Sequence, residues 1–296
     1  MITPTITNIE GLMMIENIKN IAIIGAGFMG RQIAIWTVLH DNKVHMYDLD
    51  SNSLKNAKEF ITKALERKGK EREINLVIYF NNLEHALNNV DLVIEAVSEN
   101  IEIKKEVFAQ IEKYVSSNTI IATNSSTFPI SRIENSVKKK DRVLNIHFYP
   151  PINVRPMADI MRGTQTSDEV FERGREWIKS IDCTPLILKK ESFGFLFNRI
   201  WRAVRKECLN LWEQDIADIK NIDEAWRIFT KMPYGPFTMM DGIGLDVTYD
   251  VESSYYKESG DSRDKPPDKL KEMVNHGELG IKTGKGFYIY KKEKKR

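Results

Sequence analysis

The sequence contains little cysteine. Cys183 and Cys208 are the two cysteines in 296 residues, and neither lies in a CxxC motif or beside a cluster of histidines. Structural zinc sites and disulfide scaffolds need several such residues at short, regular spacings. We therefore expect no metal and no disulfide framework, and a reducing compartment fits this cysteine usage.

The sequence also lacks a long apolar run. No segment approaches the roughly 18 apolar residues that indicate a membrane span. The N-terminus has no basic stretch followed by an apolar one, as a secretory signal would. We therefore expect a cytoplasmic protein without a membrane partner.

An excess of charge of one sign is missing as well. The chain carries 44 Lys and Arg against 42 Asp and Glu, a net charge of +2. Nucleic-acid-binding domains usually carry a strongly basic face, often with aromatic residues interleaved. The sequence has no such stripe, and we expect no nucleic-acid partner.

The first two-thirds of the chain alternates short β-branched runs with helical patterns. In residues 101–115, for example, Ile103, Val107 and Ile111 recur at intervals typical of one helix face. Such alternation predicts an α/β fold with a mostly parallel sheet and helices on both faces. The expected strands are Asn20–Gly25, Val44–Asp48, Ile74–Phe80, Asp91–Val97, Thr119–Thr123, Arg142–Phe148, Met157–Met161 and Pro185–Lys189.

A glycine-rich motif, GAGFMG at residues 25–30, directly follows the first expected strand. Gly25 permits a tight turn, Gly27 lets the backbone approach a pyrophosphate, and Gly30 lets the next helix pack closely. The N-terminus of that helix offers free N–H groups and a positive dipole end to phosphates. The predicted dinucleotide site comprises Gly25, Gly27, Phe28, Met29 and Gly30.

The next expected strand ends in an acidic residue. Asp48 lies eighteen residues after Gly30, where a carboxylate accepts hydrogen bonds from both ribose hydroxyls of a dinucleotide. A carboxylate repels the 2′-phosphate of NADP, and no arginine follows Asp48 to bind it. We therefore predict that the cofactor is NAD.

The pattern of the chain changes after about residue 190. Long helical patterns cover Phe193–Asp215 and Asn221–Met232, and one further strand is expected at Gly286–Tyr290. The change indicates a Rossmann-type domain followed by a helical domain. The predicted divisions are residues 1–190 for the NAD-binding domain, with residues 1–13 as an N-terminal extension, and residues 191–296 for the helical domain.

Polar residues near two later strand ends are candidates for chemistry, because ligands bind at this edge of open α/β sheets. Ser125 and Ser126 follow one strand, and His147 lies near the end of another. An imidazole suits the removal of a hydroxyl proton, and a carboxylate such as Asp159 on its other nitrogen stabilises the imidazolium. On the residues alone, a strand-end histidine is more often a surface or core residue, and the serines equally fit a helix cap.

Seven segments, read in chain order, carry a resemblance to a known family: GAGFMG, VIEAVSEN, TNSST, IHF, GFLFNR, PYGPFTMMDGIGLD and KTGKGFYIY. From about residue 17 to residue 290 the sequence resembles the short-chain L-3-hydroxyacyl-CoA dehydrogenases, of the 3-hydroxybutyryl-CoA dehydrogenase kind. The last three segments lie in the helical domain. They separate this family from Rossmann enzymes that share the first domain alone.

The resemblance implies catalytic roles for four positions. His147 corresponds to the family's general base, and Asp159 stands where the family has its acidic partner. Ser126 matches the serine that bonds the substrate's 3-oxygen, and Asn198 matches an active-site asparagine that also helps to hold the acyl group.

The resemblance also implies further contacts and partners. Glu99 and Lys104 match positions near the ribose and nicotinamide of NAD, and Lys282 matches another cofactor-side contact. The implied substrate is an acyl-CoA of fatty acid metabolism. The helical domain is expected to form most of a homodimer interface.

Two departures from the family's pattern matter. The partner of the histidine is usually Glu, whereas Asp159 is one methylene shorter, so the strand must sit closer or a water must bridge. The family reads His-Phe-Phe-Asn-Pro, whereas residues 147–151 read His-Phe-Tyr-Pro-Pro. Pro150 thus removes a polar contact expected near the nicotinamide and stiffens the loop.

The expected reaction is NAD-dependent oxidation of the 3-hydroxyl of an L-3-hydroxyacyl-CoA to a 3-ketoacyl-CoA, with His147 as base. Two alternatives stay open. One is a dehydrogenase of a non-CoA hydroxy acid of gulonate or carnitine type. The other is a catalytically lapsed dinucleotide-binding protein, for which Pro150 and Asp159 are the motive.

Overall fold

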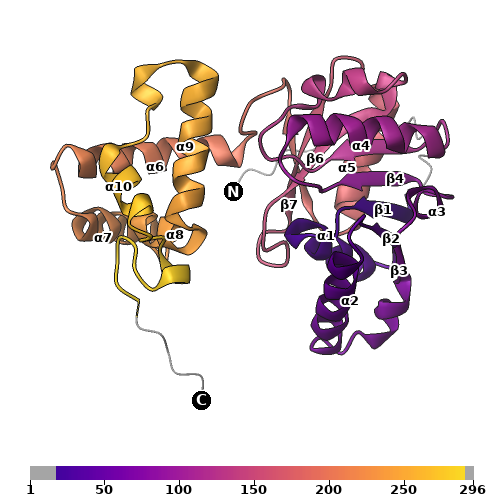
Figure 1. Ribbon diagram of the computed structural model, residues 1–296, viewed down its shortest axis with the longest axis horizontal. Helices are drawn as coiled ribbons and strands as arrows, with labels where there is room; N and C mark the ends of the chain where they lie inside the picture. The colour runs from indigo at the N-terminus through magenta and orange to yellow at the C-terminus, as the bar shows by residue number, and fades with distance from the viewer. Residues whose placement is uncertain (1–17, 291–296) are drawn as a thin grey trace, which may run out of the picture. The chain divides into compact units, whose positions relative to one another are not determined.

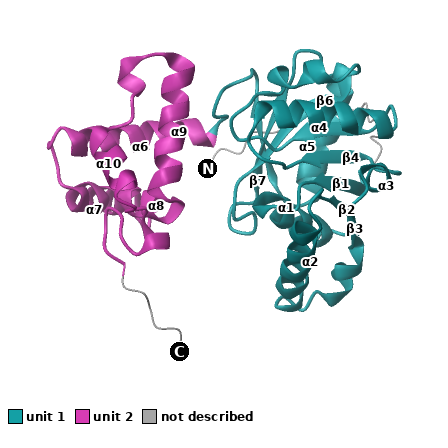
Figure 2. Cartoon of the chain, viewed as in Figure 1, with its two compact units in different colours: residues 1–196 teal, residues 197–296 magenta. Residues whose placement is uncertain are grey.

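The computed structural model describes residues 18–290 and divides the chain into two units, residues 1–196 and 197–296 (Figures 1 and 2). The change of pattern along the sequence predicts a boundary at residue 190. The extension expected at residues 1–13 lies outside the described residues.

Unit 1 contains one eight-stranded sheet in the order β3-β2-β1-β4-β5-β6-β7-β8. The strands from β3 to β6 run parallel, β7 is antiparallel to β6, and β8 is parallel to β7. This arrangement confirms the predicted mostly parallel sheet. The bounds are β1 (Asn20–Ile24), β2 (Lys43–Tyr47), β3 (Val77–Phe80), β4 (Leu92–Glu95), β5 (Ile120–Thr123), β6 (Val143–Phe148), β7 (Met157–Arg162) and β8 (Thr184–Leu188).

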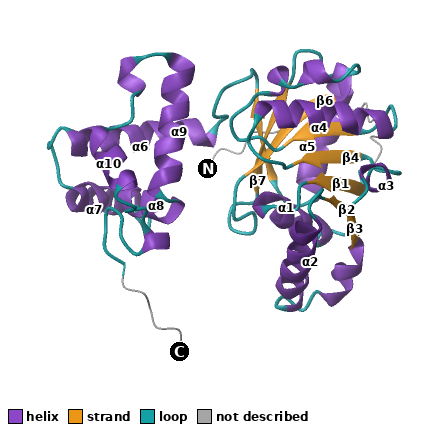
Figure 3. Cartoon of the chain, in the orientation of Figure 1, coloured by secondary structure: helices purple, strands orange, loops and turns teal. Residues whose placement is uncertain are grey.

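Helices cover both faces of this sheet (Figure 3). Ile21 and Ile23 of β1 belong to the core beneath α1, α2 and α5, whereas Ala22 and Ile24 belong to the core beneath α3 and α4. Successive side chains of a strand point to opposite faces, so a strand buried on both sides is apolar throughout. The bounds are α1 (Phe28–Val38), α2 (Ser51–Glu66), α3 (Leu83–Ala86), α4 (Ile101–Tyr114) and α5 (Asp168–Ser180).

One strand of unit 1 is shorter than predicted. The sequence predicts a strand over Ile74–Phe80, but residues Glu71–Leu76 form a 3-10 helix and β3 begins at Val77. The neighbouring β2 pairs with β3 from Val44↔Val77 onward. Residues before Val77 therefore have no strand partner for their backbone, which explains the shorter strand.

Unit 2 is helical around a core that includes Leu209, Phe237, Met240, Leu245 and Leu270. No helix of the part of the chain that the structure describes is long and apolar enough to cross a membrane. The bounds are α6 (Phe197–Glu213), α7 (Ile219–Thr230), α8 (Pro236–Ile243), α9 (Leu245–Ser259) and α10 (Asp268–Asn275).

Two predictions for this part of the chain are wrong. The helix expected from Phe193 begins at Phe197, because Gly194 and Phe195 have φ values of 76° and 57°, which a right-handed helix excludes. The strand expected at Gly286–Tyr290 is absent, and isolated bridges replace it. The Asp241 carboxylate of α8 accepts the backbone N–H groups of residues 287 and 288, so a side chain takes the place of a strand partner.

Candidate active site

The three glycines of the GAGFMG motif meet different constraints. A Cβ atom at Gly25, where φ is +111°, would lie 2.6 Å from the carbonyl oxygen of Ala96, and one at Gly30 would lie 1.9 Å from that of Gly25. The fold itself therefore requires glycine at both positions. A Cβ atom at Gly27 would meet no atom within 4 Å. The open space at Gly27 fits a ligand that approaches the backbone closely.

The N-terminus of α1 opens beside this turn. Gly27 is its N-cap and supplies no side chain to the free N–H groups, and the first turn contains no acidic residue. Such an end binds anions such as phosphate. Phe28 and Met29, both predicted cofactor residues, form this first turn: the Phe28 side chain is 62% exposed, whereas Met29 packs against the core. The motif thus offers mainly backbone to a ligand.

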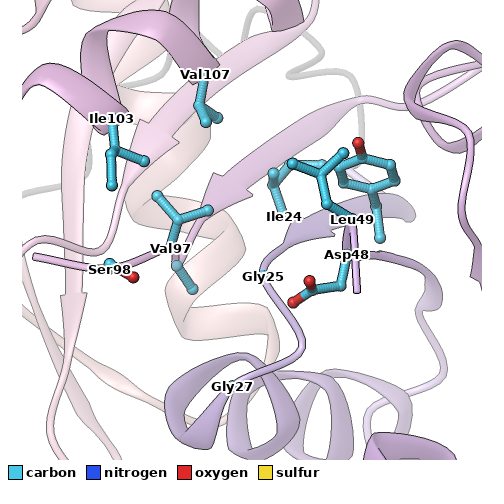
Figure 4. A pocket seen from close by; sticks show the side chains of 11 residues that line it. Ile24, Gly25, Gly27, Asp48, Leu49, Val97, Ser98, Ile103 and Val107 are labelled. Carbon is cyan, nitrogen blue, oxygen red and sulfur yellow. The ribbon is translucent and has the colours of Figure 1, made fainter. Parts of the chain in front are cut away.

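Asp48 lies next to the turn, as the motif predicts. Its Oδ2 accepts the N–H of Ala26 at 2.8 Å, and its Oδ1 accepts the N–H of Asp50 at 2.9 Å. Figure 4 shows the carboxylate directed toward the glycine turn. The backbone of two segments therefore holds the carboxylate at the carboxyl end of β2, where a ribose would bind.

A pocket of about 290 Å³ adjoins Asp48. Val97, Ile103 and Val107 form an apolar wall opposite the carboxylate (Figure 4). Tyr47 also lines the pocket, and burial together with the Asp48 carboxylate raises its pKa, so the ring stays neutral. An apolar slot with a fixed carboxylate at one side fits an adenosine, so these residues fit a dinucleotide.

Glu99 and Lys104 are part of one charged network. The Lys104 ammonium lies 2.8 Å from Glu95 Oε1 and 3.2 Å from Glu99 Oε2, and the lysine is 1% exposed. Glu99 also accepts the Ser125 hydroxyl at 2.5 Å and the Thr127 N–H at 2.9 Å. The buried Lys104 thus fixes the Glu99 carboxylate through an ion pair, and Glu99 fixes the segment after β5 through hydrogen bonds from Ser125 and Thr127.

Ser126 lies on this pinned segment. Its side chain is exposed, whereas the neighbouring Ser125 is buried and accepts the Phe128 N–H at 2.8 Å. Asn124 Oδ1 accepts the N–H of Phe148 at 2.9 Å and so joins the ends of β5 and β6. Ser126 and His147 are therefore carried by adjacent strand ends that are tied together.

His147 and Asp159 face each other across two strands. They are register partners in the antiparallel pair β6–β7, and the Nδ1 atom lies 3.2 Å from Asp159 Oδ2. Side chains directly opposite on antiparallel strands start close together, so the short aspartate reaches the imidazole without a bridging water. An ionised carboxylate can only accept, so in the neutral imidazole this contact favours the tautomer with the proton on Nδ1 and with Nε2 as the acceptor.

Two aromatic residues complete the surroundings of His147, and the sequence analysis assigned neither of them to the site. Phe195 stacks on the imidazole with ring centroids 5.0 Å apart, and Tyr149 meets it edge-on at 4.6 Å. The Tyr149 hydroxyl also donates a hydrogen bond to Asp159 Oδ2. The change from Phe to Tyr beside the change from Glu to Asp was the available signal for Tyr149.

Asn198 and Lys282 belong to unit 2. Asn198 lies in the first turn of α6 and is half-buried. The Lys282 ammonium lies 2.6 Å from both carboxylate oxygens of Asp246. This ion pair connects η6 (Ile281–Thr283) to α9. The other predicted site residues lie in unit 1.

The sheet, the glycine turn and Asp48 define a Rossmann-type dinucleotide-binding domain. Family comparison then makes the assignment specific. The NAD-binding domain model of 3-hydroxyacyl-CoA dehydrogenase matches residues 20–192, and the C-terminal domain model of the same enzyme matches residues 194–290. The chain belongs to the 3-hydroxyacyl-CoA dehydrogenase family, and it is an NAD-dependent enzyme.

Individual relatives agree with this family over almost the whole chain. The 3-hydroxybutyryl-CoA dehydrogenase of Clostridioides difficile is 32% identical, covering 92% of this chain and 99% of the relative. The crystal structure of (S)-3-hydroxybutyryl-CoA dehydrogenase from Ralstonia eutropha is 30% identical and matches with a TM-score of 0.87, covering 93% of this chain and 100% of that structure. A 5-formyl-3-hydroxy-2-methylpyridine 4-carboxylate 5-dehydrogenase of Mesorhizobium japonicum is 30% identical, covering 93% and 92%.

Proposed function

We propose that the protein oxidises the 3-hydroxyl of an L-3-hydroxyacyl-CoA to the ketone, with His147 as the general base and NAD as the hydride acceptor. The contact between His147 Nδ1 and Asp159 Oδ2 carries this proposal. It gives the imidazole the tautomer that a base needs, at the end of a strand in a sheet that binds NAD.

The path of the substrate's hydroxyl proton follows from this geometry. Nε2 of His147 accepts the proton of the substrate hydroxyl, and the fully buried Asp159 carboxylate stabilises the imidazolium that forms. The Ser126 hydroxyl positions the substrate oxygen, and Asn198 is assigned to the substrate through the family resemblance alone. Bound NAD would supply the acceptor for the hydride of the substrate's C3 carbon.

Cofactor binding follows from the backbone of unit 1. The free N–H groups at the N-terminus of α1 would hold the pyrophosphate, and Asp48 would accept hydrogen bonds from the adenosine ribose. Lys104 acts through Glu99, because the ammonium is buried between two carboxylates. Lys282 is assigned to the cofactor side through the family resemblance.

A substrate panel tests the proposal. Purified protein with NAD is given 3-hydroxyacyl-CoAs of increasing chain length, together with gulonate, carnitine and a hydroxylated pyridine carboxylate, and NADH is followed by absorbance. We expect NADH with at least one L-3-hydroxyacyl-CoA at a kcat/KM well above that for the non-CoA acids. A preference for a non-CoA acid would favour that alternative, and no NADH with any compound would favour the lapsed enzyme.

We also propose that unit 2 forms the interface of a homodimer. The end of α7 and the following turn expose Ile228, Phe229, Met232 and Tyr234, with Phe229 91% exposed. Exposed apolar groups of this size, gathered in one stretch of chain, are typical of a protein interface. Phe229→Asp is expected to lower the mass measured by light scattering from that of a dimer to that of a monomer.

The proposed location is the cytoplasm. Cys183 and Cys208 are buried free thiols, and burial raises their pKa values to about 12 and about 11. Thiols of this kind are unreactive and fit a reducing compartment.

A further inference from the structure

Two donors converge on a single oxygen of Asp159. His147 Nδ1 lies 3.2 Å from Oδ2, and the Tyr149 hydroxyl donates to the same atom. The other oxygen, Oδ1, is buried and has no hydrogen-bond partner within residues 18–290. The hydrogen bonding of this carboxylate is therefore divided between an imidazole and a phenol.

The backbone explains why Tyr149 reaches the pair. Asp159 is the register partner of His147 on β7, and Tyr149 follows His147 by two residues at the end of β6. Residues two apart along an extended chain point to the same side of a sheet. The tyrosine ring packs edge-on against the imidazole, and its hydroxyl extends to the carboxylate beyond.

Aromatic rings and one carboxylate pack against the imidazole. The imidazole is packed by Tyr149, by Phe195 from the segment before α6 and by Asp159. On the far side of β7, the register partner of Asp159 on β8 is Leu186. Among these neighbours, the carboxylate carries the one charge, so whatever shares its charge acts directly on the imidazole.

We infer that Tyr149 is a positioning residue for the His147–Asp159 pair: its hydroxyl shares the carboxylate with the imidazole and so weakens the hold of the imidazole on a proton. This inference rests on the proposed role of His147 as a base. The residue types are those that depart from the family's Phe and Glu, and the pairing gives both departures one physical reason.

The sign of the effect follows from charge. A hydrogen bond from a hydroxyl to a carboxylate withdraws part of its negative charge, and hydrogen bonds to charged groups are the strong ones. Without the hydroxyl, the buried carboxylate retains one donor and attracts a proton on the imidazole more strongly. The imidazolium is then favoured, and less free base is present at a given pH.

The test is an NMR titration of the His147 imidazole in wild-type protein and in Tyr149→Phe. The chain has five histidines, and a spectrum of His147→Gln assigns the signal. We expect the titration midpoint to move to higher pH by about half a unit or more, which corresponds to about 0.7 kcal/mol or more. Asp159→Asn is expected to move it in the opposite direction.

A matched control removes a hydroxyl elsewhere in unit 1. Tyr79→Phe changes a half-buried tyrosine of β3 that has no contact with the pair, and it is expected to leave the midpoint in place. Circular dichroism of each variant verifies the fold. A midpoint that stays the same or falls in folded Tyr149→Phe overturns the inference.

The pH dependence of kcat/KM separates this inference from the proposed function. If both hold, the acid limb of the profile moves to higher pH together with the NMR midpoint, and activity recovers above it. If the midpoint moves and the limb does not, Tyr149 still acts on His147, but His147 is not the base. The two ideas therefore fail in different measurements.

Discussion

The glycine turn and the His147–Asp159 pair lie on one sheet, yet they are built from different materials. The turn presents backbone N–H groups and open space at Gly27, and its one side-chain contribution, Asp48, is held by backbone. The pair consists of side chains from antiparallel strands that meet at 3.2 Å. The first site is a property of local chain geometry, whereas the second depends on how distant strands align.

This difference predicts how each site fails. A backbone site is lost when a side chain is added, because the ligand and the new atoms compete for the same space. A side-chain pair is lost when a charge or a ring nitrogen is removed, even where the shape is kept. Variants at the two sites should therefore separate cofactor binding from chemistry.

The largest expected effect is that of His147→Gln. Glutamine keeps polarity and approximate size but has no basic nitrogen, so kcat is expected to fall on the order of 10²–10⁴-fold. NAD affinity, measured by calorimetry, should change less than about twofold, because backbone N–H groups of the glycine turn, and not His147, bind the pyrophosphate of the cofactor. Near wild-type turnover in this variant would mean that the base lies elsewhere.

A smaller effect is expected at Gly27, with Gly30 as its contrast. Gly27→Ala adds a Cβ atom to open space, so the melting temperature should hold while NAD affinity falls about tenfold, or about 1.4 kcal/mol. Gly30→Ala places the same atom 1.9 Å from a backbone oxygen and should lower the melting temperature instead. Unchanged NAD affinity in folded Gly27→Ala would contradict a pyrophosphate at this turn.

An effect of similar size is expected for the choice of cofactor. Wild-type kcat/KM should favour NAD over NADP by at least about tenfold, because the Asp48 carboxylate repels a 2′-phosphate. Asp48→Ala should narrow that ratio, mainly by weakening NAD. Equal values for the two cofactors in the wild-type protein would remove Asp48 from the ribose site.

The same contrast explains what the sequence predicted. The glycine turn directly follows β1, and Asp48 directly follows the neighbouring β2, so spacing alone predicted that Asp48 lies beside the turn. The contact between His147 and Asp159 depends on the β6–β7 register, which spacing does not contain. The resemblance to the family predicted both residues, and the structure shows how the shorter Asp159 side chain reaches the imidazole of His147.

Some features of the structure could not be predicted from local sequence patterns, because contacts with distant residues determine them. The run of aromatic and β-branched residues within 286–290 is typical of a strand, but the Asp241 carboxylate of α8 accepts the backbone N–H groups of Phe287 and Tyr288. The long helical pattern from Phe193 continues through residues 194 and 195, whose left-handed backbone stops a helix. The role of Tyr149 could not be predicted from the sequence, because its hydroxyl meets the Asp159 carboxylate only in the folded protein.

The central claim, that the cross-strand pair is the acid–base centre, is tested most directly by the pH profile of Asp159→Asn. Asparagine keeps the shape of the side chain but removes the charge that stabilises the imidazolium. The account predicts a lower kcat at unchanged NAD affinity, and an acid limb of kcat/KM that moves to lower pH. A variant with wild-type turnover and an unmoved acid limb would contradict it.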